Sequence, residues 1–286
     1  MSRWSKRRER FRAILSGAQC VHPGSVFDPI SARIAEDIGF EVGMFAGSIA
    51  SLTVLGAPDV ILLTLTEFAE QAHRICRAAN FPLLCDADHG YGNALNVMRT
   101  VEELETAGVA ALSIEDTELP QPFGSHGKAR LTSIEEGVGK MRAAVAARRD
   151  SGLVLAGRTS AAAITGVADA IQRAKAYQTT GIDAIFLVGV KTRADLDAIA
   201  AEIELPLILG GAGKELLDLD YLSRRGVRIC LQGHQPFMAA ARAVHDTLRA
   251  LRDGVPPERL EGIASDEAMK RLMRSAEYTR WSNEWL

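Results

Sequence analysis

Apolar and polar residues repeat along the chain as a stretch with helical spacing, a glycine and then a short apolar run. Apolar positions three and four residues apart are typical of a helix with one buried face. Glycine favours the left-handed position that ends a helix, and an unbroken apolar run is typical of a strand covered on both sides. The clearest copies of this unit contain Gly39, Gly108, Gly181 and Gly226.

Eight apolar runs are candidates for strands. The first is the weakest and lies near residues 18–22; the others cover residues 42–47, 82–86, 110–115, 153–159, 184–189, 206–211 and 228–233. Helical spacing lies between them. Three sets of residues each share one helix face: Phe68, Ala72, Ile75 and Ala79; Val97, Val101 and Leu104; and Leu196, Ile199 and Ile203.

Alternating strands and helices predict a parallel sheet, and eight repeats in about 230 residues predict closure into a (β/α)8 barrel of the TIM type. The structural alternative is an open, doubly wound sheet. It is disfavoured because no glycine-rich dinucleotide loop follows the first strand. We therefore predict a single barrel domain over residues 1–286.

The end of the chain has a different pattern. The proline-containing linker RDGVPPERL follows Leu251, and residues 265–286 then have helical spacing with Trp281 and Trp285 near the end. Exposed tryptophans in a small tail are unfavourable in water. We expect the helical tail, at about residues 255–286, to pack on the barrel or on a neighbouring subunit.

Composition narrows the class of protein. Hydrophobic residues make up 47% and charged residues 24%, and the net charge is −3. This composition is typical of a globular protein and argues against a nucleic-acid-binding surface. The basic residues 3–12 are interpreted as a solvated helix face. Residues 42–58, although uncharged, are too rich in Gly, Ser and Thr for a membrane span. Four cysteines without a CxxC pair predict reduced thiols in a cytoplasmic protein: Cys20, Cys76, Cys85 and Cys230.

Acidic residues follow two neighbouring strands, at the barrel end where active sites lie. Asp86 and Asp88 end the third strand, and Glu115 and Asp116 end the fourth. Like charges brought together repel unless a cation neutralises them, and oxygen ligands favour Mg²⁺. The alternative is that Asp88 and Asp116 only cap helices or turns.

Other strand ends carry further candidates. Arg158 can bind a carboxylate through two hydrogen bonds, or it forms a structural pair with Glu115. The backbone at Gly47 and Ser48 can present N–H groups to an anion, or it is an ordinary tight turn. His234 stands before a proline that suits a first helical turn, and it is either a site residue or a structural loop residue.

Together these residues resemble the isocitrate lyase and phosphoenolpyruvate mutase superfamily. The core motifs are DADHGYG at residues 86–92 and SIED at 113–116, with a third motif from GSIAS at 47–51 to APD at 57–59. The resemblance covers residues 11–252. It is greatest to the oxaloacetate decarboxylase branch, through residues 24–29, 90–97 and 232–234.

The resemblance implies a barrel whose C-terminal helices are often swapped between subunits, in a homotetramer that is a dimer of dimers. It implies that Asp86 binds Mg²⁺ directly, whereas Asp88 and Glu115 act mainly through metal-bound waters. Substrate-binding residues are implied at Gly47, Ser48, Asp59, Arg158 and His234, with Asp86, Arg158 and His234 as the catalytic set.

One loop departs from the superfamily. Its lyases carry Lys-Lys-Cys-Gly-His or Lys-Arg-Cys-Gly-His after the fourth strand, and that cysteine is their acid. Residues 119–128 read LPQPFGSHGK, without a cysteine. Cleavage of isocitrate or methylisocitrate is therefore not expected, and the sequence assigns no role to Ser125 or His126.

The resulting hypothesis is Mg²⁺-dependent decarboxylation of the small keto acid oxaloacetate to pyruvate and CO₂. The metal acts as a Lewis acid on the ketone and holds the pyruvate enolate that forms. Alternatives are another reaction of this enolate, such as C–C or C–P hydrolysis or cleavage of a substituted malate. Two further alternatives are a Schiff-base aldolase that uses Lys191 and a barrel that only senses a keto acid.

Overall fold

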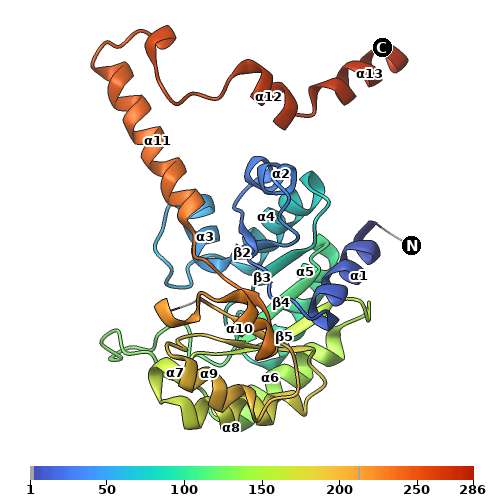
Figure 1. Ribbon diagram of the computed structural model, residues 1–286, viewed down its shortest axis with the longest axis vertical. Helices are drawn as coiled ribbons and strands as arrows, with labels where there is room; N and C mark the ends of the chain where they lie inside the picture. The colour runs from blue at the N-terminus through green and yellow to red at the C-terminus, as the bar shows by residue number, and fades with distance from the viewer. Residues whose placement is uncertain (1–2, 212) are drawn as a thin grey trace.

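The computed structural model describes residues 3–211 and 213–286. Its parallel strands form one sheet in sequence order (Figure 1). They are β1 (Gly24–Ser25), β2 (Gly43–Ala46), β3 (Leu83–Asp86), β4 (Ala111–Glu115), β5 (Val154–Thr159), β6 (Ala184–Leu187), β7 (Leu207–Leu209) and β8 (Val227–Cys230). Val21 pairs in parallel with Ile229 of β8 and closes the ring. The predicted (β/α)8 barrel is confirmed.

Helices follow the strands and cover the outside of the sheet (Figure 1). They are α2 (Pro29–Asp37), α3 (Gly47–Ala50), the π-helix η1 (Ser51–Leu55), α4 (Leu65–Ala78), α5 (Ala94–Ala107), α6 (Ile134–Ala147), α7 (Ala161–Ile164), α8 (Val167–Gln178), α9 (Arg193–Ala200), the short 3₁₀ turn η2 (Lys214–Leu216) and α10 (Leu219–Arg224). None of the helices in the described ranges is long and apolar enough to cross a membrane.

The helix faces predicted from spacing are confirmed. Phe68, Ala72 and Ile75 are buried, as are the predicted faces around Val101 and Leu196. Each of the glycines expected to end a helix has a positive φ, between 78° and 94°. At Gly108, the C-cap of α5, the backbone N–H donates a hydrogen bond to the last turn of the helix.

The weak first strand is shorter and later than predicted. Its regular part is Gly24–Ser25, and of the predicted residues 18–22 only Val21 pairs with the sheet. Pro23 separates the two pieces, and a proline has no N–H to donate to a neighbouring strand.

The basic N-terminal helix α1 (Arg3–Ser16) is solvated on one face, where Arg3, Lys6 and Arg10 are exposed, but its other face is buried, so that prediction was only partly right. Phe11 and Leu15 are buried in the cluster that fills the barrel interior. Arg8 is also buried and donates from Nε to the Val109 carbonyl at 3.0 Å, while Arg7 donates to the Cys76 carbonyl at 2.5 Å. These carbonyls lie near the ends of helices and beginnings of strands, where free carbonyls attract cations.

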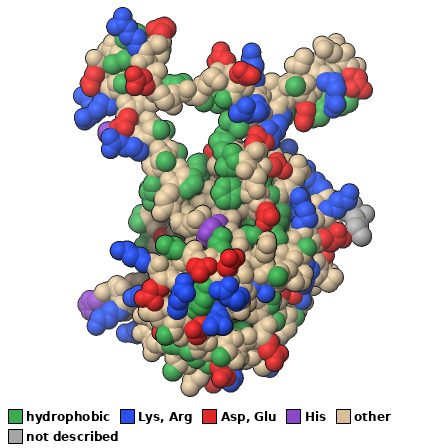
Figure 2. Space-filling view, in the orientation of Figure 1, with side chains coloured by type: hydrophobic (Ala, Val, Ile, Leu, Met, Phe, Trp, Pro, Cys, Tyr) green, Lys and Arg blue, Asp and Glu red, His purple; other side chains and the backbone are tan. Residues whose placement is uncertain are grey.

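The C-terminal helices leave the barrel. They are α11 (Gln235–Arg252), the turn η3 (Pro257–Arg259), α12 (Asp266–Leu272) and α13 (Ser275–Trp285), and none of them contains a buried residue. Figure 1 shows α11 projecting away and the tail running back above α2, and Figure 2 shows apolar side chains exposed on this arm. The helical pattern predicted for residues 265–286 is confirmed except for a break at Arg274, whose φ is 58°.

The tail touches the barrel through α2. Arg274 pairs with Asp37 at 2.7 Å, and Arg33 donates to the Leu272 carbonyl at 2.8 Å. The tryptophans lie beyond these contacts: Trp281 stacks on Trp285 at 6.1 Å between ring centroids, and Trp285 is 68% exposed. Within one chain the tail therefore leaves its aromatic residues largely uncovered.

Candidate active site

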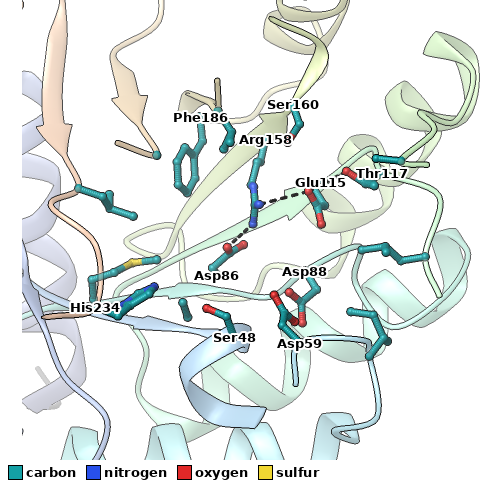
Figure 3. A pocket seen from close by; sticks show the side chains of 18 of the residues that line it. Ser48, Asp59, Asp86, Asp88, Glu115, Thr117, Arg158, Ser160, Phe186 and His234 are labelled. Carbon is teal, nitrogen blue, oxygen red and sulfur yellow. Dashed lines mark hydrogen bonds and ion pairs between the residues drawn. The ribbon is translucent and has the colours of Figure 1, made fainter. Parts of the chain in front are cut away.

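A pocket of about 350 Å³ opens at the C-terminal ends of the strands (Figure 3). It gathers acidic side chains, one arginine and one histidine against an apolar wall. The polar lining includes Ser48, Asp59, Asp86, Asp88, Glu115, Arg158 and His234, and the apolar lining includes Met44, Phe186, Val188 and Leu231. All of the side chains predicted for the site except Gly47, which has none, line this one pocket.

Strand register brings the charged residues together. Asp86 is the partner of Ser113 across β3 and β4, and Glu115 is the partner of Arg158 across β4 and β5. Hydroxyl groups hold both carboxylates: Ser113 Oγ donates to Asp86 Oδ1 at 2.9 Å, and Thr117 Oγ1 donates to Glu115 Oε2 at 2.8 Å. Asp86 and Glu115 are 8% and 5% exposed, so these orientations are set by protein rather than by solvent.

Arg158 lies between two carboxylates. Its Nη1 donates to Asp86 Oδ2, and its Nη2 lies 3.4 Å from Glu115 Oε2 (Figure 3). Burial alone lowers the pKa of this guanidinium, but Asp86 and Glu115 outweigh burial and raise it. Arg158 therefore does pair with Glu115, as the structural alternative predicted, but it pairs with Asp86 as well. Its Nε is buried without a hydrogen-bond partner in the described part of the chain.

Asp88 is held in an unusual place. Its φ is 48°, and its carboxylate lies so close to Gly47 that a Cβ there would be 2.4 Å from Oδ2. Burial raises the pKa of Asp88 well above its usual range, and Asp86 and Asp59 raise it further. Asp59 comes from the exposed loop after η1 and points to the same space (Figure 3).

This donor set fits a hard divalent cation. Among the described lining residues, Asp59, Asp86, Asp88 and Glu115 face one guanidinium, so acidic groups are in excess, and their carboxylate oxygens are the ligands that such a cation prefers. Among residues 3–211 and 213–286 no three acidic, histidine or cysteine side chains already form a cage for an ion. The Arg158 guanidinium lies between the carboxylates of Asp86 and Glu115.

Gly47 and Ser48 begin a helical segment rather than a tight turn. The segment is α3, which continues directly into η1, with Ala46 extended before it. Ser48 points into the pocket beside Asp88 and Asp59 (Figure 3). Because the first N–H groups of a helix have no partner within it, the two amides remain candidates for binding an anion.

His234 is fixed by a partner that sequence reasoning missed. Its Nδ1 lies 2.8 Å from the hydroxyl of Ser25 on β1, 209 residues earlier in the chain. Burial lowers the pKa of His234, although Asp86 and Asp59 oppose this, so the neutral ring is favoured. The only available signal was that Ser25 belongs to residues 24–29, which carry part of the family resemblance.

Asp116 faces away from the pocket. It is fully buried and accepts hydrogen bonds from Tyr177 OH at 2.6 Å and from Arg173 Nη1 at 3.0 Å. Successive residues of a strand point to opposite faces, which separates Asp116 from Glu115. It is neither a site residue nor a helix cap, and it joins β4 to α8.

The remaining candidates lie outside the pocket. In the loop after β4, Leu119 and Ala129 line the cavity, but Ser125 is buried near Gln121 and His126 is exposed. None of the described lining residues is a cysteine; Cys20, Cys76, Cys85 and Cys230 are all buried elsewhere, and burial raises their pKa values. Lys191 is exposed and does not line the pocket, which removes the residue that a Schiff-base aldolase needs.

Comparison with known proteins agrees with this geometry. Residues 11–252 match the phosphoenolpyruvate phosphomutase family. A protein of Bradyrhizobium diazoefficiens named oxaloacetate decarboxylase is 62% identical over 95% of this chain and 94% of its own length. One of Rhodopseudomonas palustris with the same name is 60% identical, over 96% and 94%.

Solved structures show the same architecture. Phosphoenolpyruvate phosphomutase from Streptomyces platensis superposes with a TM-score of 0.86 at 27% identity, over 97% of this chain and 99% of that one. Phosphonopyruvate hydrolase, in complex with oxalate and Mg²⁺, gives 0.85 at 28%, over 98% and 99%. The chain is thus an enzyme of the phosphoenolpyruvate mutase and isocitrate lyase superfamily. Within that superfamily it belongs to the oxaloacetate decarboxylase family.

Proposed function

We propose that this enzyme decarboxylates oxaloacetate to pyruvate and CO₂, with Mg²⁺ as its cofactor and pyruvate enolate as the intermediate. The observation that carries the proposal is the pocket in which four carboxylates face Arg158 and His234. Relatives about 60% identical over nearly the whole chain are named for this activity, which supports the choice of substrate.

Asp86 is proposed as the direct ligand of Mg²⁺, with Asp88 and Glu115 acting through waters. The buried carboxylates of Asp86 and Glu115, with Asp88 beside them in the pocket, support this assignment. When bound, the ion supplies a Lewis acid that draws electrons from the 2-keto group. Ser113 and Thr117 keep the Asp86 and Glu115 carboxylates oriented for this role.

The chain's own groups would bind the substrate. Arg158 holds the C1 carboxylate through donors not committed to Asp86 and Glu115, and Asp59 lines the mouth of the pocket. When the C3–C4 bond breaks, its electron pair moves towards the C2 oxygen and C4 leaves as CO₂. The amides of Gly47 and Ser48 donate to the developing oxyanion.

His234 donates a hydrogen bond to the same developing charge. Ser25 occupies Nδ1, so the ring presents its other nitrogen to the substrate. Water supplies the proton that then enters at C3 and gives pyruvate. Phe186 and Leu231 form an apolar wall beside these groups.

A second candidate is another reaction of the same enolate, as a lyase or hydrolase that acts on a small 2-keto acid or a substituted malate. This candidate is supported by similarity to two solved hydrolases, a phosphonopyruvate hydrolase at 28% identity and an oxaloacetate acetylhydrolase at 27%. The absence of a thiol from the described pocket lining argues against isocitrate and methylisocitrate as substrates.

The proposal extends to assembly and location. We propose one barrel domain with the tail at about residues 255–286, in a homotetramer built as a dimer of dimers whose C-terminal helices are exchanged. Exposed Met238, Val244 and Leu248 on α11 support this, because such a face is unfavourable in water. The cysteines, all unpaired, support a cytoplasmic location.

The decisive experiment measures pyruvate release from four substrates: oxaloacetate, methylisocitrate, 2,3-dimethylmalate and phosphonopyruvate. Spontaneous decarboxylation of oxaloacetate, measured without protein at the same Mg²⁺ concentration, is subtracted. Oxaloacetate is expected to be turned over fastest and methylisocitrate not at all. Undiminished activity in excess EDTA would refute the metal requirement, and faster turnover of another substrate would favour the second candidate.

A further inference from the structure

The turn that follows β3 has an unusual backbone. Four of its residues have positive φ: Asp88 at 48°, Gly90 at 77°, Tyr91 at 59° and Gly92 at 148°. For Asp88 and Tyr91, which have side chains, this conformation is strained. Such a turn persists only when the surrounding structure holds it.

Lys140 on α6 holds this turn from outside the pocket. Its side chain is almost fully buried, and Nζ donates to the carbonyl of His89 at 3.0 Å. Burial lowers the pKa of Lys140, although Glu136 and Glu115 oppose the change. Burying an ammonium group is costly in a way that burying an apolar side chain is not, so the placement of Lys140 under the turn requires an explanation beyond packing.

Thr100 on α5 provides a second, weaker contact. Its buried hydroxyl lies 3.0 Å from the carbonyl of Gly90, and also 3.0 Å from the carbonyl of Asn96 in its own helix. The single hydroxyl hydrogen is shared between these acceptors. Two helices thus donate to consecutive carbonyls of the same turn.

The carboxylate at the start of the turn has little freedom. It lies directly against the backbone of Gly47, at a spacing too small for any side chain there. The Glu115 N–H donates to the Asp88 carbonyl at 2.8 Å, which couples the turn to the end of β4. A shift of the turn would therefore move Asp88 relative to the other carboxylates of the pocket.

We propose that Lys140, assisted by Thr100, is a positioning residue that keeps the Asp88 carboxylate where it contributes to divalent-ion binding. Neither side chain lines the pocket, so neither touches ion or substrate. The inference rests on the proposed function, because it assumes that Asp88 takes part in binding the ion.

The test is Mn²⁺ binding to the full-length, substrate-free enzyme, followed by the electron paramagnetic resonance signal of free Mn²⁺. Lys140→Met is expected to weaken binding by about tenfold or more, as loss of an outer-shell partner typically does. Thr100→Val is expected to weaken it less, and Lys140→Arg to restore much of the loss. Asp88→Asn gives the reference for losing the carboxylate itself.

Two matched controls separate positioning from stability. Arg8→Met removes a buried cation that donates to the Val109 carbonyl at 3.0 Å, and Thr180→Val removes a hydroxyl that donates to the Tyr177 carbonyl at 2.6 Å. Neither residue lines the pocket, and Arg8 lies at the opposite end of the barrel. Both variants are expected to melt earlier and to bind Mn²⁺ like the parent.

A folded Lys140→Met variant with the parent's Mn²⁺ affinity would overturn the inference. If that variant does not fold, Thr100→Val decides, and unchanged affinity there overturns it equally. Unchanged affinity in Asp88→Asn would overturn it while leaving an ion site at Asp86. A parent enzyme that binds no Mn²⁺ would refute the proposed function together with the inference.

Discussion

The two ends of the barrel use the same kinds of charged group in opposite ways. At the N-terminal end, the arginines of α1 each meet acceptors: Arg8 pairs with Asp150 at 2.6 Å, and Arg12 with Asp183 at 3.0 Å. At the C-terminal end, Arg158 is the one arginine or lysine among the described lining residues of the pocket, and it faces four carboxylates. Matched charge closes one end, whereas unmatched charge leaves the other end able to bind a cation.

The two ends also differ in how far side chains fill the barrel interior. Phe11 and Leu15 enter the barrel interior from α1 and fill it at that end. The pocket at the C-terminal end keeps about 350 Å³ free. Loss of a charge at the closed end should therefore affect stability, and loss of a charge at the open end should affect function.

The largest expected effect is that of Asp86→Ala. Turnover of oxaloacetate is expected to fall below detection because the proposed direct ligand is gone, while the circular dichroism spectrum stays that of the folded parent. The control is Asp116→Asn, thirty residues on, which disrupts a buried pair with Arg173 outside the pocket. That variant is expected to be less stable and still active; the reverse pattern would contradict the division between the two kinds of carboxylate.

At the closed end, Arg8→Met is expected to lower the free energy of unfolding by about 3 kcal/mol, because it leaves Asp150 and the Val109 carbonyl without their partner. Denaturant unfolding measures this loss, and kcat should stay within about twofold of the parent. Full stability in the variant would mean that water replaces the arginine without cost.

At the open end, His234→Gln is expected to lower kcat for oxaloacetate by roughly 10²-fold, the usual effect of losing a donor to a developing oxyanion. Mg²⁺ affinity should change little, because the ring is not proposed as a ligand. Steady-state kinetics with a parallel metal titration measures both. A higher KM with unchanged kcat would assign His234 to ground-state binding instead.

The smallest effect is expected for Thr117→Val, which removes the hydroxyl that donates to Glu115 Oε2 at 2.8 Å. Loss of one such bond corresponds to about 1 kcal/mol. We expect this to appear as a modestly higher Mg²⁺ concentration for half-maximal activity, with little change in melting temperature. An unchanged metal requirement would show that Arg158 alone orients Glu115.

Local pattern predicted most of the fold. The faces around Phe68 and Val101 and the glycines that end helices were predicted correctly, because spacing and backbone preference act within a few residues. Strand ends likewise predicted Asp86, Asp88 and Glu115 for the pocket, whereas Asp59 was implied only by the family resemblance. The start of the sheet was predicted less accurately, since Pro23 interrupts a segment that is already short.

The missed features all depend on partners distant in the chain. The basic pattern of α1 does not reveal that carbonyls near residues 76, 109 and 152 accept its arginines. Ser25 and His234 meet only because β1 and β8 become neighbours. Asp116 and Glu115 look alike in sequence, and only the direction of the strand face separates them.

The ring of strands closes where the fewest backbone hydrogen bonds join two neighbours. Between β8 and the segment before β1, Val21 makes two backbone hydrogen bonds, to Arg228 at 2.9 Å and from Cys230 at 3.0 Å, while β4 and β5 pair over five positions. The chain enters the barrel on one side of this seam, through α1, and leaves it on the other, through α11. In mechanical terms, a force applied to the two ends of the domain acts across its weakest joint. Stretching should therefore unzip the barrel from Val21 and peel β8 away before the strands that carry Asp86, Glu115 and Arg158 separate.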